Sequence, residues 1–199
     1  TPMVIARRLG PVDYGVYSVV MSLSAIVIGV FGLGQNSALH KLVPQYYAAD
    51  RERSGAILAD ALLVTSGALA VFCAGFFLSS GWIAGHVYRD PSLTGVFRIC
   101  AALMMTLTLF SLGASAIAGL QDFKSYNLIQ VARNLALLVF AWGGVWLAGL
   151  NGALAGQLLA SVFGLALIAY GGAGLLRDRF PNGVRPVFSR EILGVIGSF

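Results

Sequence analysis

Long apolar runs without any charged side chain constrain this chain more than any other feature. Four stretches contain no Asp, Glu, Lys or Arg: residues 14–40, 61–88, 99–121 and 134–176. A helix that crosses a bilayer needs only about 20 apolar residues, so each of the first three can cross once. The fourth is about twice that length, and the turn-forming sequence Gly149-Leu150-Asn151-Gly152 lies near its centre. We therefore expect this run to contain parts of two spans joined by a tight hairpin.

The composition agrees with a chain that lies in lipid. Hydrophobic residues make up 58% of it and charged residues 11%, against roughly 25% charged residues in soluble domains, and the mean hydropathy is +0.83. Charges and Gly/Pro turns predict complete spans near residues 13–36, 56–80, 94–118, 124–148 and 152–175. The predicted fold class is an all-α, polytopic transmembrane helical bundle.

Two proline-containing turns separate predicted spans. The tail of one helix is predicted to end near residue 5. Gly10-Pro11 marks the turn that follows, because proline lacks the backbone N–H that a helix interior needs. Asp90-Pro91-Ser92 marks a second turn, with Pro91 suited to the first turn of the next helix. The chain opens at Thr1 without Met and stops inside an apolar run that starts near residue 192, so we expect it to be a fragment.

The basic residues give an orientation through the excess of Lys and Arg in cytoplasmic loops. When alternate loops are grouped, one side holds Lys41, Arg51, Arg53, Lys124, Arg177, Arg179, Arg185 and Arg190. The other side holds Arg7, Arg8 and Arg89. The first side is predicted to be cytoplasmic, and Arg7 and Arg8 are exceptions to the bias.

The most prominent polar cluster inside a predicted span comprises Asn127, Gln130, Arg133 and Asn134. Steps of three and four residues place such side chains near one another on a helix. Ionisable groups at membrane depth cost about 2.5–3.5 kcal/mol on insertion scales, so they usually line a cavity or are paired. Two interpretations stay open: this face lines a hydrophilic cavity, or it lies in the first turns of the helix, where Arg133 extends to the surface.

Two further ionisable residues lie about one turn inside predicted spans. Arg98 is close enough to the interface for its side chain to reach water, which favours an interfacial role. Asp60 follows a helix N-terminus, which favours a carboxylate, and Lys41 or Arg53 could neutralise it. Coupling of a proton or another cation is the alternative role for Asp60.

Several classes of chemistry have no motif here. The sequence contains no G-x-x-x-x-G-K-[ST], no H-E-x-x-H and no G-x-S-x-G, and Cys73 and Cys100 occur singly in different apolar runs. We expect no catalysis, no cofactor and no metal. The net charge of +5 does not indicate nucleic-acid binding, because the basic residues are scattered between spans.

The helix predicted from residue 152 carries small residues four apart, at Gly152, Gly156, Ala160 and Gly164. Such a stripe lets another helix backbone approach closely, so it predicts a packing face. A sliding surface during transport is the alternative.

A family resemblance rests on the string ARRLGPVDYGVY at residues 6–17, followed by FGLG at residues 31–34. It resembles the A-R-x-L-G-P-x-x-Y-G-x-Y signature of polysaccharide-export flippases. AGLQ at residues 118–121, Arg133-Asn134 and GLNGA at residues 149–153 agree with it. The family is the O-antigen and exopolysaccharide (Wzx-type) branch of the multidrug/oligosaccharidyl-lipid/polysaccharide (MOP) exporter superfamily.

This resemblance implies two six-helix lobes that face one another across a central cavity. Residues 1–176 would form the N-terminal lobe from the end of helix 1 to helix 6, residues 177–190 a cytoplasmic loop, and residues 191–199 the start of helix 7. The implied localisation is the bacterial cytoplasmic (inner) membrane, with both termini of the protein in the cytoplasm.

The implied substrate is an undecaprenyl-pyrophosphate oligosaccharide, flipped by alternating access and driven by an ion gradient. Arg7, Arg8, Arg133 and Arg98 are the candidates to hold the pyrophosphate, because the planar guanidinium can bind phosphate oxygens with two hydrogen bonds. Asn and Gln side chains would contact sugar hydroxyls. Expected partners are this lipid-linked oligosaccharide, membrane lipids and a coupling cation, H⁺ or Na⁺. A polysaccharide polymerase and other assembly proteins are further candidates.

Other functions would give the same hydropathy. A multidrug antiporter or a peptidoglycan-precursor flippase of the same superfamily is the nearest alternative, although an antiporter should carry clearer intramembrane carboxylates than Asp60 alone. A membrane-embedded enzyme of polysaccharide synthesis is the alternative from another class, and it should carry a large polar loop with clustered Asp, Glu or His. A structural or assembly subunit is a third.

Overall fold

The computed structural model describes residues 2–49 and 51–179, with side chains for residues 8–32 and 54–175. Its long helices are α1 (Pro2–Ala49), α2 (Arg51–Trp82), α3 (Thr94–Gly119) and α4 (Phe123–Arg179). Two short helices, η1 (Ile83–Val87) and η2 (Pro91–Leu93), connect α2 to α3, and the described chain contains no strand. The predicted all-α class is therefore confirmed.

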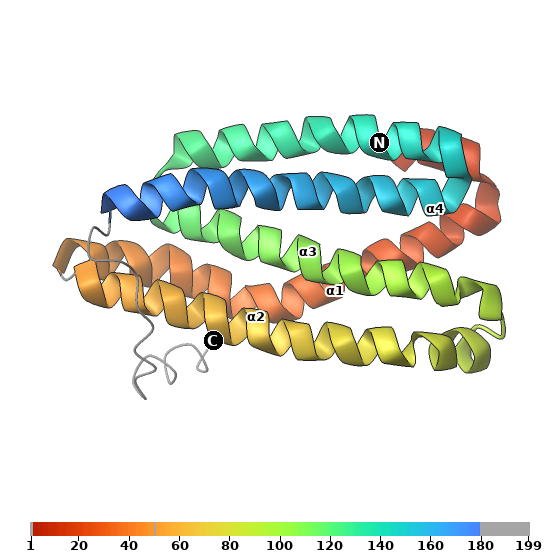
Figure 1. The fold of residues 1–199 in the computed structure, drawn as a ribbon, viewed down its shortest axis with the longest axis horizontal. Coiled ribbons are helices and arrows are strands. Elements are labelled where there is room, and N and C mark those ends of the chain that lie inside the picture. The colour runs from red at the N-terminus through yellow and green to blue at the C-terminus, as the bar shows by residue number, and fades with distance from the viewer. Residues whose placement is uncertain (1, 50, 180–199) are drawn as a thin grey trace.

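Gly10 breaks α1 into a short and a long segment. Its φ of 77° and ψ of 172° lie outside the helical region, in a part of conformational space that glycine adopts readily. Pro11 follows it and cannot donate a backbone hydrogen bond across the break. The chain reverses direction at one end of the bundle, as Figure 1 shows, so the predicted turn at Gly10-Pro11 is confirmed.

A second break, at Ala148 and Gly149, folds α4 into two antiparallel halves (Figure 1). Gly149 has a φ of 56°, which a residue with a Cβ rarely adopts. The halves then pack through glycines: a Cβ on Gly152 would overlap the carbonyl of Gly144, and one on Gly156 would overlap the backbone of Phe140. The structure thus confirms both the predicted hairpin and the predicted packing face.

The connection between α2 and α3 is capped by Asp90. Its carboxylate accepts hydrogen bonds from the Ser92 N–H at 3.0 Å and the Ser92 hydroxyl at 2.6 Å, and Pro91 opens the first turn of η2. These hydrogen bonds hold the pKa of Asp90 below its ordinary value. The predicted turn at Asp90-Pro91-Ser92 is confirmed.

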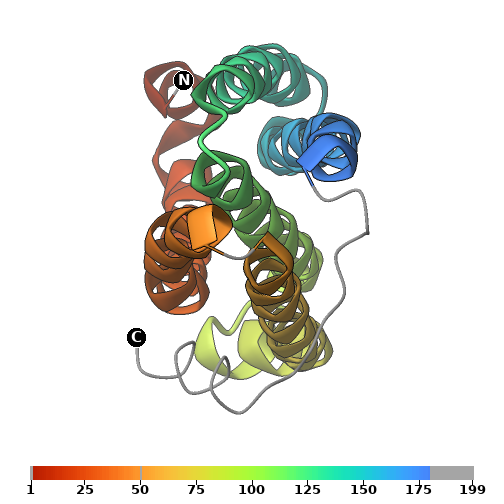
Figure 2. The same cartoon turned by 90° about the vertical axis from the view of Figure 1, so that its left-hand side faces the viewer.

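The core forms around α3, which lies between the other helices (Figure 2). In the most apolar part of the span that ends at Gly119, 61% of the residues are buried, against 22% in that of α2. The main core cluster joins α3 to every other long helix; its members include Val20, Leu69, Cys100, Leu103, Met104 and Leu154. The other helices therefore surround α3 and keep one side exposed.

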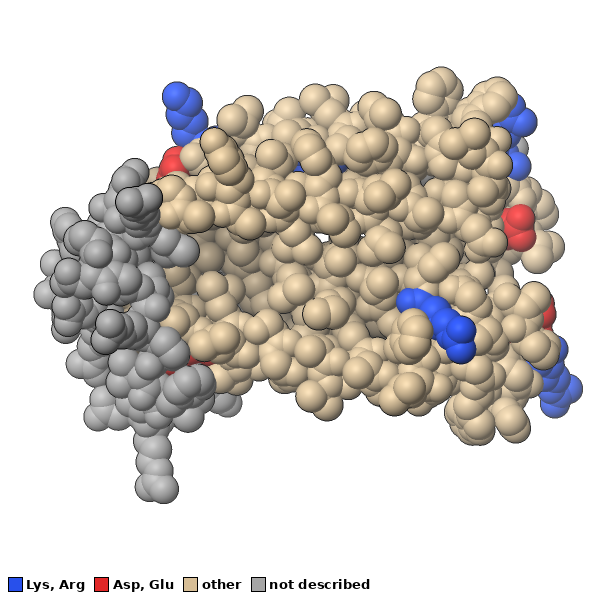
Figure 3. All heavy atoms as spheres, in the orientation of Figure 1, with Lys and Arg blue, Asp and Glu red and all other residues tan. Residues whose placement is uncertain are grey.

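The exposed surface is that of a membrane protein. In the described part of the chain, four helical stretches are long and apolar enough to cross a bilayer: Arg8–Gly32, Ser54–Val87, Pro91–Gly119 and Phe123–Leu175. Large apolar side chains such as Leu78 and Leu147 are 82% and 90% exposed. Figure 3 shows charged side chains mainly at the two ends of the molecule, with isolated basic side chains in the broad, largely uncharged band between them. The chain is therefore a multi-pass membrane protein.

Because α4 is folded in two, the described chain runs along the bundle five times, in the places predicted for the complete spans. Successive connections lie at opposite ends of the bundle (Figure 1), as the grouping of Lys and Arg assumed. The six-helix lobe needs one further complete pass, which the described residues do not contain. The predicted segments at residues 180–199 lie outside the described residues.

The hairpin of α4 can be tested through Gly152. Replacement by Val should lower the free energy of unfolding by about 1–3 kcal/mol, because its side chain would overlap the Gly144 backbone. Gly143→Ala is the matched control, since a Cβ there meets nothing within 4 Å. Unfolding of the purified full-length protein in SDS measures both effects, and equal midpoints for the two variants would show that the halves do not pack closely.

The orientation can be tested by cysteine labelling in intact cells. We expect a membrane-impermeant maleimide to label Ser92→Cys, because this exposed residue lies in the connection assigned to the outer side. Glu52→Cys should react only after the cells are permeabilised. Native Cys73 and Cys100 are buried and should add little background. The opposite labelling pattern would invert the topology.

Candidate functional site

A polar pocket of about 390 Å³ opens between α1, α3 and the first half of α4. It is lined by Ile28, Leu107, Phe110, Ser111, Ala114, Ser115, Tyr126, Gln130 and Arg133. So many polar groups are unusual between membrane-spanning helices, because polar groups are costly in a hydrocarbon environment. We therefore take this pocket as the candidate functional site.

The start of α4 determines which of its side chains face the pocket. Gln121 has a φ of 61° where the chain turns out of α3, and the Asp122 carboxylate then accepts the Ser125 N–H at 3.1 Å. This bond satisfies a backbone donor that would otherwise be free at the helix N-terminus. Tyr126, Gln130 and Arg133 follow at steps of four and three residues, so all three line the pocket.

Among the residues that the structure describes, Arg133 is the only charged one that lines this pocket. It is ten residues beyond Phe123, or about 15 Å along the helix, which is about half of a hydrocarbon core of roughly 30 Å. Its guanidinium carbon lies 4.6 Å from the centre of the Phe110 ring, within the range of a cation–π contact. The structure thus places a positive charge deep in the bundle, against an aromatic face.

One N–H donor of Arg133, at Nε, is both buried and without a hydrogen-bond partner among the described residues. An unpaired buried donor costs about 1–3 kcal/mol, and more when it is charged. Because Arg133 lines the pocket, an anion there would stabilise its positive charge in these apolar surroundings.

The other polar groups of the pocket can donate and accept hydrogen bonds. The Gln130 amide donates to the Tyr126 hydroxyl at 3.2 Å, and Ser111 and Ser115 lie one turn apart on α3. Sequence reasoning missed Tyr126 and both serines. The four-residue spacing of the serines within an apolar helix was the available signal, together with the position of Tyr126 four residues before Gln130.

The predicted polar face of α4 is divided in the structure. Gln130 and Arg133 line the pocket, whereas Asn127 and Asn134 are exposed and do not line it. The structure therefore brings together two of the four residues in this predicted cluster.

Arg8 lies far from this pocket. Its guanidinium carbon is 3.7 Å from the centre of the Trp146 ring, near the hairpin of α4, and Trp142 packs edge-on against Trp146. Trp146 is thirteen residues beyond Arg133, about 20 Å along the helix. Arg8 and Arg133 therefore do not reach the same phosphate group in this arrangement. The side chain of Arg7 lies outside the described residues.

The other two predicted residues also lie outside the pocket lining. Arg98 is exposed, with its guanidinium carbon 5.4 Å from the centre of the Phe77 ring of α2. Asp60 is fully buried on α2 and has an interaction partner within the structure. Neither residue is brought together with Arg133 in the pocket.

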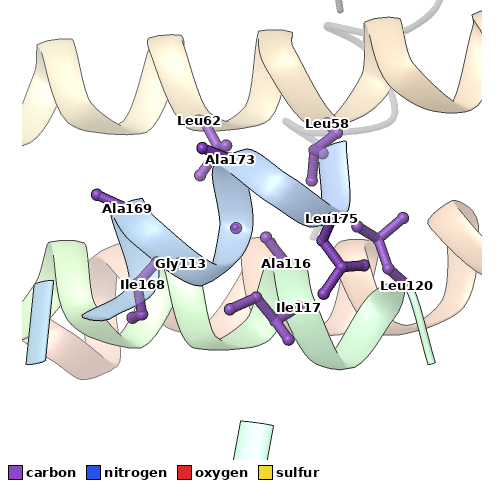
Figure 4. Close-up of a pocket in the computed structure, with 11 residues that line it drawn as sticks. Leu58, Leu62, Gly113, Ala116, Ile117, Leu120, Ile168, Ala169, Ala173 and Leu175 are labelled. Carbon is purple, nitrogen blue, oxygen red and sulfur yellow. The ribbon is translucent and has the colours of Figure 1, made fainter. Parts of the chain in front are cut away.

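A second, apolar pocket of about 250 Å³ lies between α2, the end of α3 and the end of α4, as Figure 4 shows. Its labelled lining includes Leu58, Leu62, Ile117 and Leu120, and none of the described residues that line it is charged. Such walls offer no hydrogen bonds to a sugar or a phosphate. Of these two pockets, the one around Arg133 is the one with polar chemistry.

Metal binding has no support in the described residues, where no group of three or more His, Cys, Asp or Glu side chains comes together. Cys73 and Cys100 are buried, free thiols in the core. The site therefore consists of one cation and neutral hydrogen-bonding groups.

The comparisons with known proteins agree with this picture. The family model described as polysaccharide biosynthesis protein matches residues 1–191. No curated protein and no solved structure matches the chain. The match covers nearly the whole sequence and bears out the resemblance seen in residues 6–17. The chain thus belongs to the polysaccharide biosynthesis protein family, the family of the Wzx-type flippases.

Proposed function

We propose that this chain is part of a transporter that flips an undecaprenyl-pyrophosphate-linked oligosaccharide across the bacterial cytoplasmic membrane. The observation that carries the proposal is the positively charged Arg133 in the lining of a polar pocket between membrane-spanning helices, with a buried Nε donor that has no partner among the described residues. Because the chain belongs to a polysaccharide biosynthesis family, an anion attached to a saccharide is the class of ligand that such a site would meet. A lipid-linked saccharide has the anionic group and the hydroxyl groups that these side chains would bind.

The chemistry of the pocket suits the head of such a lipid. A pyrophosphate loses its hydration when it enters the bundle, and a guanidinium offers two parallel charge-assisted hydrogen bonds in return. Gln130, Ser111, Ser115 and Tyr126 supply neutral groups that could hydrogen-bond to phosphate or sugar oxygens. The polyprenyl chain would remain in the surrounding lipid, because it is as apolar as the bilayer.

Within this proposal, residues 1–176 belong to the first of two six-helix lobes, and the complete cavity includes the second lobe. Arg8 rests on Trp146, which is about 20 Å beyond Arg133 along α4, so the two arginines would meet the head group at different stages of transport. Asp60 is the candidate for coupling H⁺ or Na⁺, because it is a buried carboxylate within a span.

Replacement of Arg133 tests the proposal in the intact protein. Arg133→Ala should lower surface polysaccharide at least about tenfold, because it removes a charge-assisted hydrogen bond worth more than 1.4 kcal/mol. Arg133→Lys should retain part of the activity, since it keeps the charge but loses the planar guanidinium group, which can form two parallel hydrogen bonds. Surface polysaccharide in cells that lack the native gene measures both.

Val131→Ala is the matched control, because Val131 is exposed on the same helix and does not line the pocket. All three variants should reach the membrane in equal amounts. Normal surface polysaccharide with Arg133→Ala would remove Arg133 from the binding site.

A further inference from the structure

Gly164, on the second half of α4, lies directly behind the contact between Arg133 and Phe110. A Cβ added to Gly164 would be 2.8 Å from both Cδ2 and Cε2 of Phe110 and 3.1 Å from Cδ of Arg133. Carbon atoms do not approach to 2.8 Å without something moving, since their optimal separation is about 3.5–4.0 Å. Only a residue without a side chain leaves the ring and the arginine where they are.

We infer that Gly164 is a positioning residue, which sets the place of the Arg133 guanidinium in the polar pocket through the Phe110 ring. The inference rests on the proposed function, in which Arg133 binds the phosphate group of the substrate. Gly164 touches neither substrate nor pocket; it is not among the residues that line the cavity.

The Phe110 ring connects Gly164 to the guanidinium group of Arg133, because it packs against both. Phe110 is 5% exposed, belongs to a buried cluster with Ala114, Ile117 and Ile129, and also lines the polar pocket, so a shift of its ring changes the pocket wall. Its face carries the guanidinium at 4.6 Å. Any displacement of the ring therefore moves the surface on which the charge rests.

Gly164 is not the most crowded glycine between α3 and α4, but the residues that it contacts, Phe110 and Arg133, line the polar pocket. A Cβ on Gly113 would be equally crowded, 2.7 Å from Cγ2 and 3.3 Å from Cδ1 of Ile168. Gly113 lines the apolar pocket and not the polar one. Gly113→Ala is thus a matched control, which adds the same methyl group with similar overlap but does not contact Phe110 or Arg133.

The experiment measures binding of inorganic pyrophosphate to the purified full-length protein in detergent, from the rise in melting temperature with ligand concentration. Gly164→Ala and Gly113→Ala should both lower the melting temperature without ligand, because both overpack the helix interface. Of these two variants, only Gly164→Ala should weaken pyrophosphate affinity, by about tenfold, because small displacements in a positioned site have large effects. Arg133→Ala should weaken it by at least as much.

The outcomes separate the inference from the proposed function. Wild-type affinity in Gly164→Ala, together with lost affinity in Arg133→Ala, would overturn the positioning role and leave the binding site intact. An equal loss in Gly113→Ala would also overturn it, since the effect would then come from general overpacking. Wild-type affinity in Arg133→Ala would overturn the proposed site and the inference with it.

Phe110→Leu tests the same link if Gly164→Ala does not fold. This variant removes the aromatic face without adding volume, and it should weaken pyrophosphate binding severalfold through loss of the cation–π contact. Where Gly164→Ala does fold, a protein with both substitutions should lose less affinity than the product of the two single losses, because both act through one contact. Unchanged affinity in Phe110→Leu would contradict the role given to the ring.

Discussion

The structure depends on one constraint: in hydrocarbon, every backbone N–H and C=O group must be satisfied within the protein, because no water is there to bind it. Helices meet this requirement, and the described chain consists of them almost entirely. The two breaks inside long helices, at Gly10 and at Ala148–Gly149, both lie at an end of the bundle (Figure 1). There the freed backbone groups can reach water or lipid head groups.

The same constraint explains how a charged pocket persists inside the bundle. Glycines let the two halves of α4 and helix α3 approach closely, so that Phe110 and Arg133 both pack against Gly164 and against each other. An aromatic face compensates part of the cost of burying a guanidinium, but it leaves the Nε donor without a partner. A positive charge in the pocket lining and a buried donor without a partner among the described residues thus define a site that favours an incoming anion.

Much of the fold could be predicted from the sequence. The spans, the turns at Gly10-Pro11 and Asp90-Pro91-Ser92, and the hairpin at Gly149 all follow from charge-free runs and local backbone chemistry. These signals are local, so a single sequence contains them.

The site was less predictable, because it depends on how helices far apart in the sequence turn toward one another. Periodicity grouped Asn127 and Asn134 with Arg133, but the rotation of α4 against α3 turns only Gln130 and Arg133 into the pocket. The contact between Arg133 and Phe110 joins two helices whose relative rotation no local signal gives. For the same reason, the sequence could not separate Arg8, which rests on Trp146, from Arg133.

Translocation by the full-length protein in liposomes tests the central claim most directly, with a fluorescently labelled undecaprenyl-pyrophosphate oligosaccharide as substrate and a quencher outside the vesicles. The account predicts that the wild-type protein moves labelled lipid between the leaflets and that Arg133→Ala, incorporated in equal amount, does so at least about tenfold more slowly. Equal rates for the two proteins, or no movement by the wild type under an imposed ion gradient, would contradict it.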